Sequence, residues 1–259
     1  PKSGCIIVTL SKYVSDCMDK EGKFRGLGYI IKTTMYCAVP TVLVMMQPDF
    51  GTAFVFICIM VFIYFIGRIS WGYILTAAGG LAVCMPLAYY FVLSDSQRER
   101  IDVFINPESD LQNSGYNVAQ SKIAIGSGQL TGKGFFSEGT LAQLRFVPER
   151  HTDFIFAGIV EGLGFVGGTI IICLFFALIF RWIYIAMRTK DSFGTCLVVG
   201  VAGMFTAHVF ENIGMTIGLM PVTGIPLPFI SYGGSNLLTN LIGVGIVENV
   251  WMRRQSKKR

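Results

Sequence analysis

The fold of this 259-residue chain is decided by stretches such as Phe165–Phe180, which reads FVGGTIIICLFFALIF and carries no charge. A second uncharged run covers Ala53–Gly67. A helix needs about 20 mostly apolar residues to cross roughly 30 Å of hydrocarbon. Over the whole chain 53% of the residues are hydrophobic and only 14% are charged, whereas about a quarter are charged in soluble domains. The composition predicts an all-α polytopic membrane protein and excludes a disordered chain, a coiled coil and an ordinary cytosolic enzyme.

Six spans follow from the apolar runs and from the helix breakers between them. The expected spans are Tyr29–Met46, Gly51–Gly67, Trp71–Leu93, Phe154–Trp182, Phe193–Leu219 and Ser235–Met252. Residues 1–28 mix apolar side chains with lysines, which predicts a cytoplasmic interfacial helix or a connector from an earlier span. We therefore expect residues 29–259 to form a helical bundle, with a large ordered loop at 94–153 between the third and fourth spans.

The orientation of the bundle follows from Lys and Arg, which are enriched in cytoplasmic segments. Fifteen of the 21 lie at or before the first span, in the turns near Arg68 and Arg188, or in the tail after Met252. The two short turns on the other side carry none. This distribution predicts that both termini are cytoplasmic and that the 94–153 loop is external. The net charge of +5 is then a topology signal, and we expect no nucleic-acid partner.

The external loop ends in Pro148–Phe156, PERHTDFIF, where several polar groups meet the start of the fourth span. One interpretation is capping of that span by Thr152 or Asp153, with Glu149 near the positive end of the helix dipole. The other is catalytic, because a carboxylate at an apolar boundary is desolvated and accepts a proton more readily. The local sequence favours capping slightly and leaves both interpretations open.

Two further stretches contain helix breakers. Gln47–Thr52, QPDFGT, predicts a turn in which Pro48 ends one helix and Asp49 caps the next. The alternative is that Gln47 and Asp49 line a cavity. Pro221–Ser235, PVTGIPLPFISYGGS, contains three prolines and three glycines and cannot be a continuous helix. Irregular backbone at membrane depth must be buried in protein or line a cavity, so we expect a re-entrant element near a site on the outer face.

Other features support weaker inferences. Gly126–Gly134, GSGQLTGKG, resembles a phosphate-binding loop, but its glycine spacing is wrong and no Ser or Thr follows Lys133, so we reject a nucleotide site. His208 and Glu211 share one helix face, either as a functional pair or as a structural tie. Five glycines on the fourth span offer a close-packing face, for a partner or for this chain itself: Gly158, Gly162, Gly164, Gly167 and Gly168.

Together these motifs resemble the SEDS family (shape, elongation, division and sporulation), which includes RodA and FtsW. The matching stretches are Gln47–Thr52, Gly115–Gly128, Pro148–Phe156 and Pro221–Ser235, in the family's order. Asn106-Pro107, Ser121-Lys122 and Gly132–Phe135 are more similar to the RodA branch. The resemblance implies ten spans, of which this chain has the last six and lacks the first four. Two departures are Glu161-Gly162, where the family usually has two glutamates, and Asn236, where Ser is frequent.

The resemblance implies a peptidoglycan glycosyltransferase that polymerises lipid II at the outer face of the bacterial cytoplasmic membrane, for cell elongation and shape. It places Asp153 at the family's essential external-loop aspartate, as general base toward the 4-hydroxyl of the acceptor sugar. The residues expected to bind the diphosphate or the rest of the substrate are Lys122, Lys133, Arg145, Arg150 and Ser231. The residues expected to line the substrate cavity are Gln47, Asp49 and His151. A divalent cation, Mg²⁺ or Mn²⁺, and a class B penicillin-binding protein with transpeptidase activity are the implied cofactor and partner.

Two functions from other classes stay open at this point. The first is a flippase or transporter of the lipid-linked precursor, because broken helices and intramembrane ionisable groups are typical of transporters. The second is a non-catalytic scaffold that recruits a transpeptidase. The polar groups concentrate on the expected outer side rather than through the membrane depth, which favours the enzyme.

Overall fold

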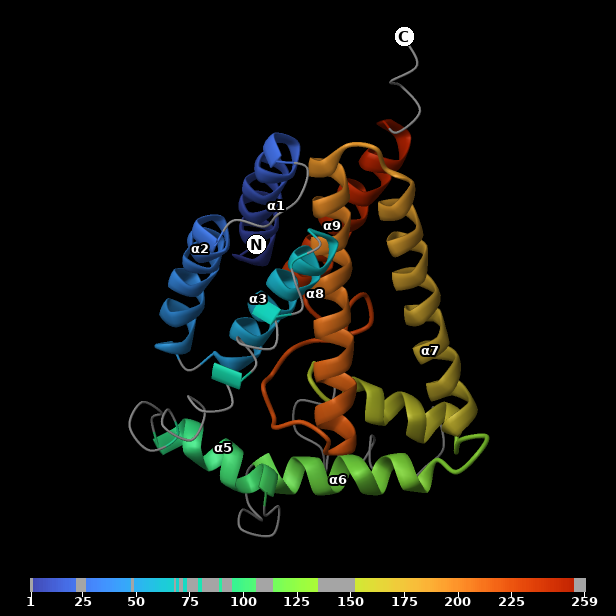
Figure 1. Ribbon diagram of the computed structural model, residues 1–259. Coiled ribbons are helices and arrows are strands. Elements are labelled where there is room, and N and C mark those ends of the chain that lie inside the picture. The colour runs from blue at the N-terminus through green and yellow to red at the C-terminus, as the bar shows by residue number, and fades with distance from the viewer. Residues whose placement is uncertain are drawn as a thin grey trace. The chain divides into compact units, whose positions relative to one another are not determined.

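The structure is a computed structural model, and it describes residues 2–21, 27–47, 49–67, 69, 72–73, 79–80, 89, 95–105, 114–134 and 152–253. The helices of these ranges are α1 (Lys2–Glu21), α2 (Leu27–Met45), α3 (Phe50–Ile66), α5 (Asp95–Ile105), α6 (Ser114–Ser127), α7 (Ile155–Arg188), α8 (Ser192–Ile217) and α9 (Gly234–Arg253). Figure 1 shows them as a fold built of helices, and the described residues contain no strand. The expected all-α fold is confirmed.

Five of the six expected spans correspond to helices α2, α3, α7, α8 and α9. The third, Trp71–Leu93, lies mostly outside the described residues. Within the described part of the chain, three helices are long and apolar enough to cross a membrane, namely Gly28–Met45, α7 and α8, and α3 is an apolar helix of 17 residues. These helices make the chain a multi-pass membrane protein, whereas the orientation of its termini stays a prediction.

Helix α7 continues beyond the expected end of the fourth span. The predicted span ends at Trp182, but the helix extends to Arg188. The Arg181 guanidinium lies 4.9 Å from the ring centroid of Trp251 and 5.8 Å from that of Tyr184. A cation over an aromatic ring is stabilised by the ring quadrupole, so the helix tolerates this charge without ending.

The chain forms two compact units, and α5, α7, α8 and α9 each contribute residues to both. Unit 1 contains Pro1–Arg98, Phe180–Ala207 and Leu241–Arg259, and unit 2 contains Glu99–Ile179 and His208–Asn240. Each unit is described by itself. All of the residues around Asp153 that are discussed below belong to unit 2.

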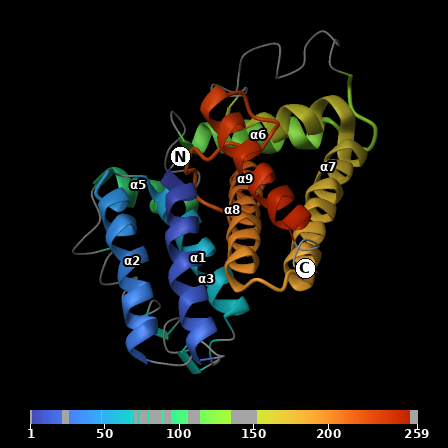
Figure 2. The same cartoon turned by 90° about the horizontal axis from the view of Figure 1, so that it is seen from above.

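In unit 1, helices α1, α2 and α3 lie side by side (Figures 1 and 2). The apolar face of α1 is buried through Ile7 and Leu10, each 2% exposed. Gly200 on α8 allows a close approach, because a Cβ there would lie 2.8 Å from the Ile7 side chain and 3.3 Å from that of Ile63. The α1 segment, expected at the membrane interface, therefore packs one face into the helices of this unit.

Unit 2 is held together by two apolar clusters. The first joins the start of α7 to the segment after α8, and its buried members are Phe156, Val160, Phe175 and Leu227. The second is smaller: Val118 from α6 and Phe154 pack together, with Val222 against them. The backbone of residues 221–233 is non-helical and contains a positive φ of 62° at Phe229. Leu227 in this segment is fully buried, whereas Tyr232 is 83% exposed. The expected break in the helix is confirmed, and the re-entrant position near the outer face stays a prediction.

Helix α7 bends sharply at Gly164, which has φ 73° and ψ −174°. Figure 1 shows its first turns running in a different direction from the residues that follow. At this bend the amides of Phe165 and Val166 do not follow the helical pattern; they donate to Gln129 O at 2.8 Å and Leu130 O at 3.2 Å.

The carbonyls on the other side of the bend are also satisfied by a distant segment. Glu161 O accepts from Lys133 N at 3.0 Å, and Gly162 O accepts from Gly134 N at 2.9 Å. In a regular helix the carbonyls of Glu161 and Gly162 would accept from the amides of Phe165 and Val166. Residues 128–134, the kink loop, bind these four groups instead, through four hydrogen bonds. Buried backbone groups must be paired, so the kink depends on this loop.

Candidate functional site

Asp153 lies in the turn of residues 152–154, directly before α7. Helix α7 begins at Ile155, two residues after Asp153. The capping of this helix by Thr152 or Asp153 stays a prediction. Phe154 is 2% exposed and anchors the turn in the cluster with Val118, which leaves the half-buried Asp153 side chain at the edge of that cluster.

The peptide groups on both sides of Asp153 are held by buried side chains. Asn212 Nδ2, on α8, donates to Asp153 O and to Ile225 O, each at 2.8 Å. The Ser231 hydroxyl donates to Thr152 O at 2.6 Å and accepts from Leu227 N at 2.8 Å. The turn before α7 is therefore tied to α8 and to the irregular 221–233 segment.

The Asp153 carboxylate faces that same segment. A Cβ built on Gly224 would lie 3.5 Å from Asp153 Oδ2, which is ordinary van der Waals contact. Gly224 directly precedes Ile225, whose carbonyl is bound by Asn212. The carboxylate thus contacts a segment of backbone, at Gly224, that the hydrogen bond from Asn212 to Ile225 O holds in place.

Two cationic side chains line a small hollow beside this turn. Arg100 from α5 and Lys122 from α6 border it, together with Val118 and Val222 of the smaller cluster. The Lys122 side chain lies directly over Gly218, where an added Cβ would be 2.4 Å from Nζ.

Lys122 is placed by its neighbour in the sequence. Ser121 is fully buried and its hydroxyl donates to Thr216 O at 2.7 Å, so α6 is fastened to the end of α8. Figure 1 shows α6 lying across this end of α8. Lys122 and the Asp153 carboxylate are therefore carried by segments that pack on one cluster, that of Val118 and Phe154.

Lys133 has a different environment. Its ammonium lies 3.8 Å from Glu161 Oε1, with 40% of its side chain exposed and 2% of the glutamate exposed. Ser127 Oγ is 3.5 Å from the same oxygen. Lys133 is thus engaged at the kink of α7, and its expected contact with the diphosphate stays a prediction.

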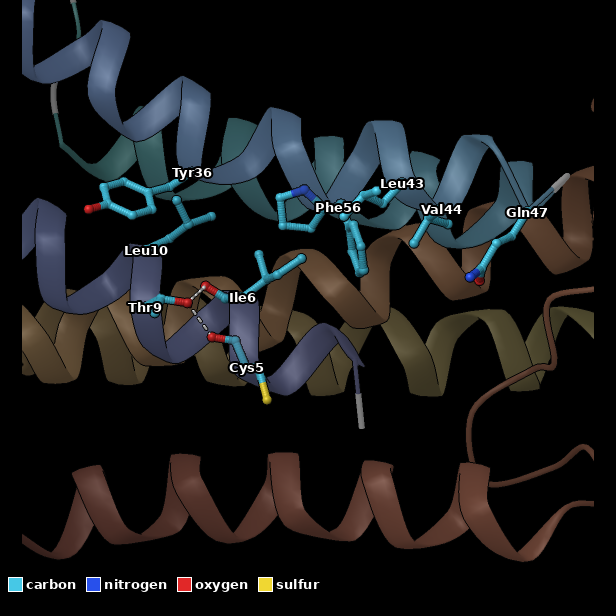
Figure 3. Close-up of a pocket in the computed structure, with 10 residues that line it drawn as sticks. Cys5, Ile6, Thr9, Leu10, Tyr36, Leu43, Val44, Gln47 and Phe56 are labelled. Atoms are coloured by element: carbon cyan, nitrogen blue, oxygen red, sulfur yellow. Dashed lines mark hydrogen bonds between the residues drawn. The ribbon is translucent and has the colours of Figure 1, made fainter.

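Gln47 and Asp49 belong to unit 1. Gln47 lines a cavity of about 450 Å³ whose other walls come from α1, α2 and α3. Figure 3 shows Ile6 and Phe56 pointing toward each other in this cavity, with the Gln47 amide at one end. The Asp49 side chain caps α3 by accepting from Thr52 N at 3.0 Å, which confirms the capping interpretation for this residue.

Unit 2 contains four of the predicted site residues, Lys122, Lys133, Asp153 and Ser231. Arg145, Arg150 and His151 lie outside the described residues. His208 and Glu211 lie on α8, where Glu211 is 1% exposed. His208 Nδ1 is buried and has no hydrogen-bond partner among the residues that the structure describes.

The glycine face of the fourth span is used by the chain itself. Gly164 and Gly168 are buried, and an added Cβ would meet Gly132 N at 2.4 Å and the Val160 side chain at 2.7 Å, respectively. A Cβ added to Gly158 would have nothing within 4 Å. Gly162 is buried, and its carbonyl accepts a hydrogen bond from Gly134 N. Internal packing accounts for this face better than a partner does.

The sequence as a whole matches the model of the FtsW, RodA and SpoVE family, described as cell cycle proteins, over residues 4–256. The chain belongs to this family. It is similar to peptidoglycan glycosyltransferase MrdB of Escherichia coli (strain K12), with 44% identity over 217 residues that cover 84% of this chain and 58% of MrdB. It is also similar to stage V sporulation protein E of Bacillus subtilis (strain 168), with 38% identity over 257 residues that cover 95% of this chain and 65% of that protein.

Two solved structures share the fold. A chain of a peptidoglycan synthase complex, whose structure concerns the coordination of polymerization and crosslinking, superposes with a TM-score of 0.79 at 27% identity over 97% of this chain and 68% of its own. The rod shape determining protein RodA of Thermus thermophilus gives a TM-score of 0.63 at 25% identity, over 96% and 64%. The chain spans about 58% of the length of the MrdB relative named above.

In this FtsW/RodA/SpoVE family member, the described residues contain no group of three or more His, Cys, Asp or Glu side chains that could hold a metal ion. Mg²⁺ usually keeps water ligands and binds through one or two carboxylates together with substrate phosphates. The divalent cation implied by the resemblance therefore stays a prediction.

Sequence reasoning missed three residues of this site in the FtsW/RodA/SpoVE chain. Asn212 was not distinguished from other polar residues of the fifth span, although a buried amide there required partners. Arg100 was one of several charges in the external loop. Gly224 was noted as a helix breaker and not as a contact of the carboxylate. Contacts across long sequence separations carry no local signal, so only the fold could find them.

Proposed function

We propose that the protein is a peptidoglycan glycosyltransferase that polymerises lipid II at the outer face of the bacterial cytoplasmic membrane. Relatives such as MrdB bear this activity in their names. The observation that carries the proposal is the Asp153 carboxylate, fixed through its backbone by Asn212 and lying against Gly224. A general base must be held in place to abstract a proton in a single geometry.

The chemistry follows from this arrangement. Asp153 accepts the proton of the acceptor sugar's 4-hydroxyl, whose oxygen then bonds to the anomeric carbon of the donor. The bond from that carbon to the undecaprenyl diphosphate breaks, and the electron pair leaves with the diphosphate. Preorganised cations stabilise such developing negative charge. Arg100 and Lys122 border a hollow that is also lined by Val118 and Val222, the residues that pack with Phe154 next to Asp153.

A divalent cation is a second part of the proposal, and it rests on the family resemblance. Oxygen atoms of the substrate diphosphate and water molecules would supply most of the ligands of this cation. The chemistry that such an ion supplies is neutralisation of the leaving group.

A transpeptidase partner, a class B penicillin-binding protein, is a third part. It is supported by the similarity to a chain of a peptidoglycan synthase complex that concerns both polymerization and crosslinking. Co-purification of a transpeptidase with the protein from native membranes tests it. Repeated purification in several mild detergents without any transpeptidase would contradict the partnership.

The substitution Asp153→Asn tests the catalytic proposal. Asn preserves the shape of the side chain but cannot accept the hydroxyl proton, so polymerisation of lipid II should fall by about 10²- to 10⁴-fold. The assay measures glycan chains made by the full-length protein with its partner present. Asp102→Asn, an exposed carboxylate on α5, is the matched control and should keep normal activity. Wild-type activity in the Asp153 variant would contradict the mechanism.

The same assay separates the enzyme from a transporter. If the protein instead moved the precursor across the membrane, labelled lipid II would change leaflet in liposomes without forming glycan chains. Polymerisation by the purified protein excludes this alternative as its sole activity.

A further inference from the structure

Two buried side chains bind the two peptide groups that flank the Cα atom of Asp153. Ser231, 6% exposed, binds the carbonyl of Thr152 at 2.6 Å, and Asn212, fully buried, binds the carbonyl of Asp153 at 2.8 Å. A peptide group is planar and rigid. Holding both peptide groups therefore restricts φ and ψ of Asp153 and so sets the direction in which its side chain leaves the backbone.

The same two side chains also fix the surface that the carboxylate contacts. The Asn212 amide binds Ile225 O, the residue after Gly224, and the Ser231 hydroxyl accepts from Leu227 N. One amide nitrogen has two hydrogens, so Asn212 can serve both carbonyls at once. Asn212 and Ser231 thus hold both the backbone of Asp153 and the 224–227 segment that its carboxylate contacts.

We propose that Asn212 and Ser231 are positioning residues that orient the Asp153 carboxylate for proton abstraction. This inference rests on the proposed function, because it assigns a task to the base of that reaction. Asn212 and Ser231 touch the backbone of Asp153 and its neighbours, and we assign them no contact with the reacting atoms. The contact of Ser231 with substrate, expected from the family resemblance, is then replaced by an indirect role.

The test compares Asn212→Asp and Ser231→Ala with wild type in the full-length protein. Asp has the shape of Asn but lacks its two donors, and Ala lacks the hydroxyl. Misplacing a catalytic group by about 1 Å can cost about 100-fold, so kcat for lipid II polymerisation should fall by about 10- to 100-fold in each variant. KM should stay within about twofold, because the positioned group acts on the chemical step. Thr206→Val on α8, which removes a hydroxyl that bonds to Ala202 O of the same helix, is the control and should leave kcat unchanged.

A double-mutant cycle distinguishes positioning from general stability. In an Asp153→Asn background, adding Asn212→Asp should cause no further loss of residual polymerisation, because the carboxylate that it positions is already absent. A further loss equal to that in the wild-type background would overturn the inference. If Asn212→Asp does not fold, Ser231→Ala, a smaller change, carries the same cycle.

The failures of the two proposals are distinguishable. Full activity in Asp153→Asn alone contradicts the proposed function. An inactive Asp153→Asn variant, combined with wild-type kcat in both Asn212→Asp and Ser231→Ala, keeps the proposed function and overturns the positioning role.

Discussion

Gly132 and Gly164 meet backbone to backbone: a Cβ on Gly164 would lie 2.4 Å from Gly132 N, and a Cβ on Gly132 would lie 2.1 Å from Gly162 O. Both glycines have positive φ, 80° and 73°. No side chain fits between two main chains at this separation. The contact allows the kink loop to bind the four backbone groups that the bend in α7 releases.

This contact links the loop that is predicted to be external to the start of α7. The seven residues of the kink loop follow α6, which carries Lys122, and they set the direction of the α7 turns that follow Asp153. The glycine-rich sequence that superficially resembled a phosphate-binding loop therefore binds backbone carbonyls and amides of this same chain.

Gly164→Ala should destabilise the protein. Its φ and ψ lie in a region that is essentially restricted to glycine and costs about 1–3 kcal/mol for other residues, and the added Cβ also collides with backbone of the kink loop. Thermal unfolding of the purified full-length protein measures the effect. Gly158→Ala, where nothing lies within 4 Å of the new Cβ, is the control and should be neutral or slightly stabilising because Ala favours a helix. Equal stability of the two variants would contradict this account of the kink.

Lys133→Met should destabilise unit 2 by about 1–2 kcal/mol. Removing one partner of a buried ion pair costs about 3–5 kcal/mol, and the 40% exposure of the Lys133 side chain reduces this through solvent screening. The double variant with Glu161→Gln should recover part of the loss, because the buried charge is then gone. Melting temperatures of the two single variants and the double variant give the coupling. Purely additive effects would show that the pair contributes nothing.

Asp49→Ala should lower stability by about 1 kcal/mol, the usual cost of losing an N-cap, because the hydrogen bond from Thr52 N is lost. Asp49→Asn should restore it, since Asn caps about as well. Thermal unfolding checks both variants. If Asp49→Asn kept its stability but lost polymerisation, a role of the charge in the substrate cavity would be indicated instead.

Cysteines introduced at Leu130 and Lys190 should react from opposite sides of the membrane. Leu130 is 67% exposed and belongs to the loop that is predicted to be external. Lys190 follows α7 in a turn that the Lys and Arg distribution predicts to be cytoplasmic. The measurement uses an impermeant maleimide on intact cells, in a variant whose seven native cysteines are replaced. Labelling of Lys190→Cys, but not Leu130→Cys, from outside would reverse the predicted topology.

The sequence alone determined the features whose physical causes are local. Apolar runs predicted five helices that the structure shows, because burial in hydrocarbon depends on the composition of each segment. The Asp49 cap was predictable because it joins residues three apart. The irregular 221–233 segment followed from its prolines and glycines, which cannot continue a helix.

The tertiary structure decided what depends on residues far apart in the chain. Asn212 reaches a carbonyl 59 residues away and Ser231 one that is 79 residues away, and Gly164 bends α7 only because a loop some thirty residues earlier accepts and donates the released hydrogen bonds. Side-chain type shows which groups need partners, since buried polar groups must be paired. The packing of the helices determines which partners these groups have. The same packing places the Asp153 carboxylate against the backbone at Gly224.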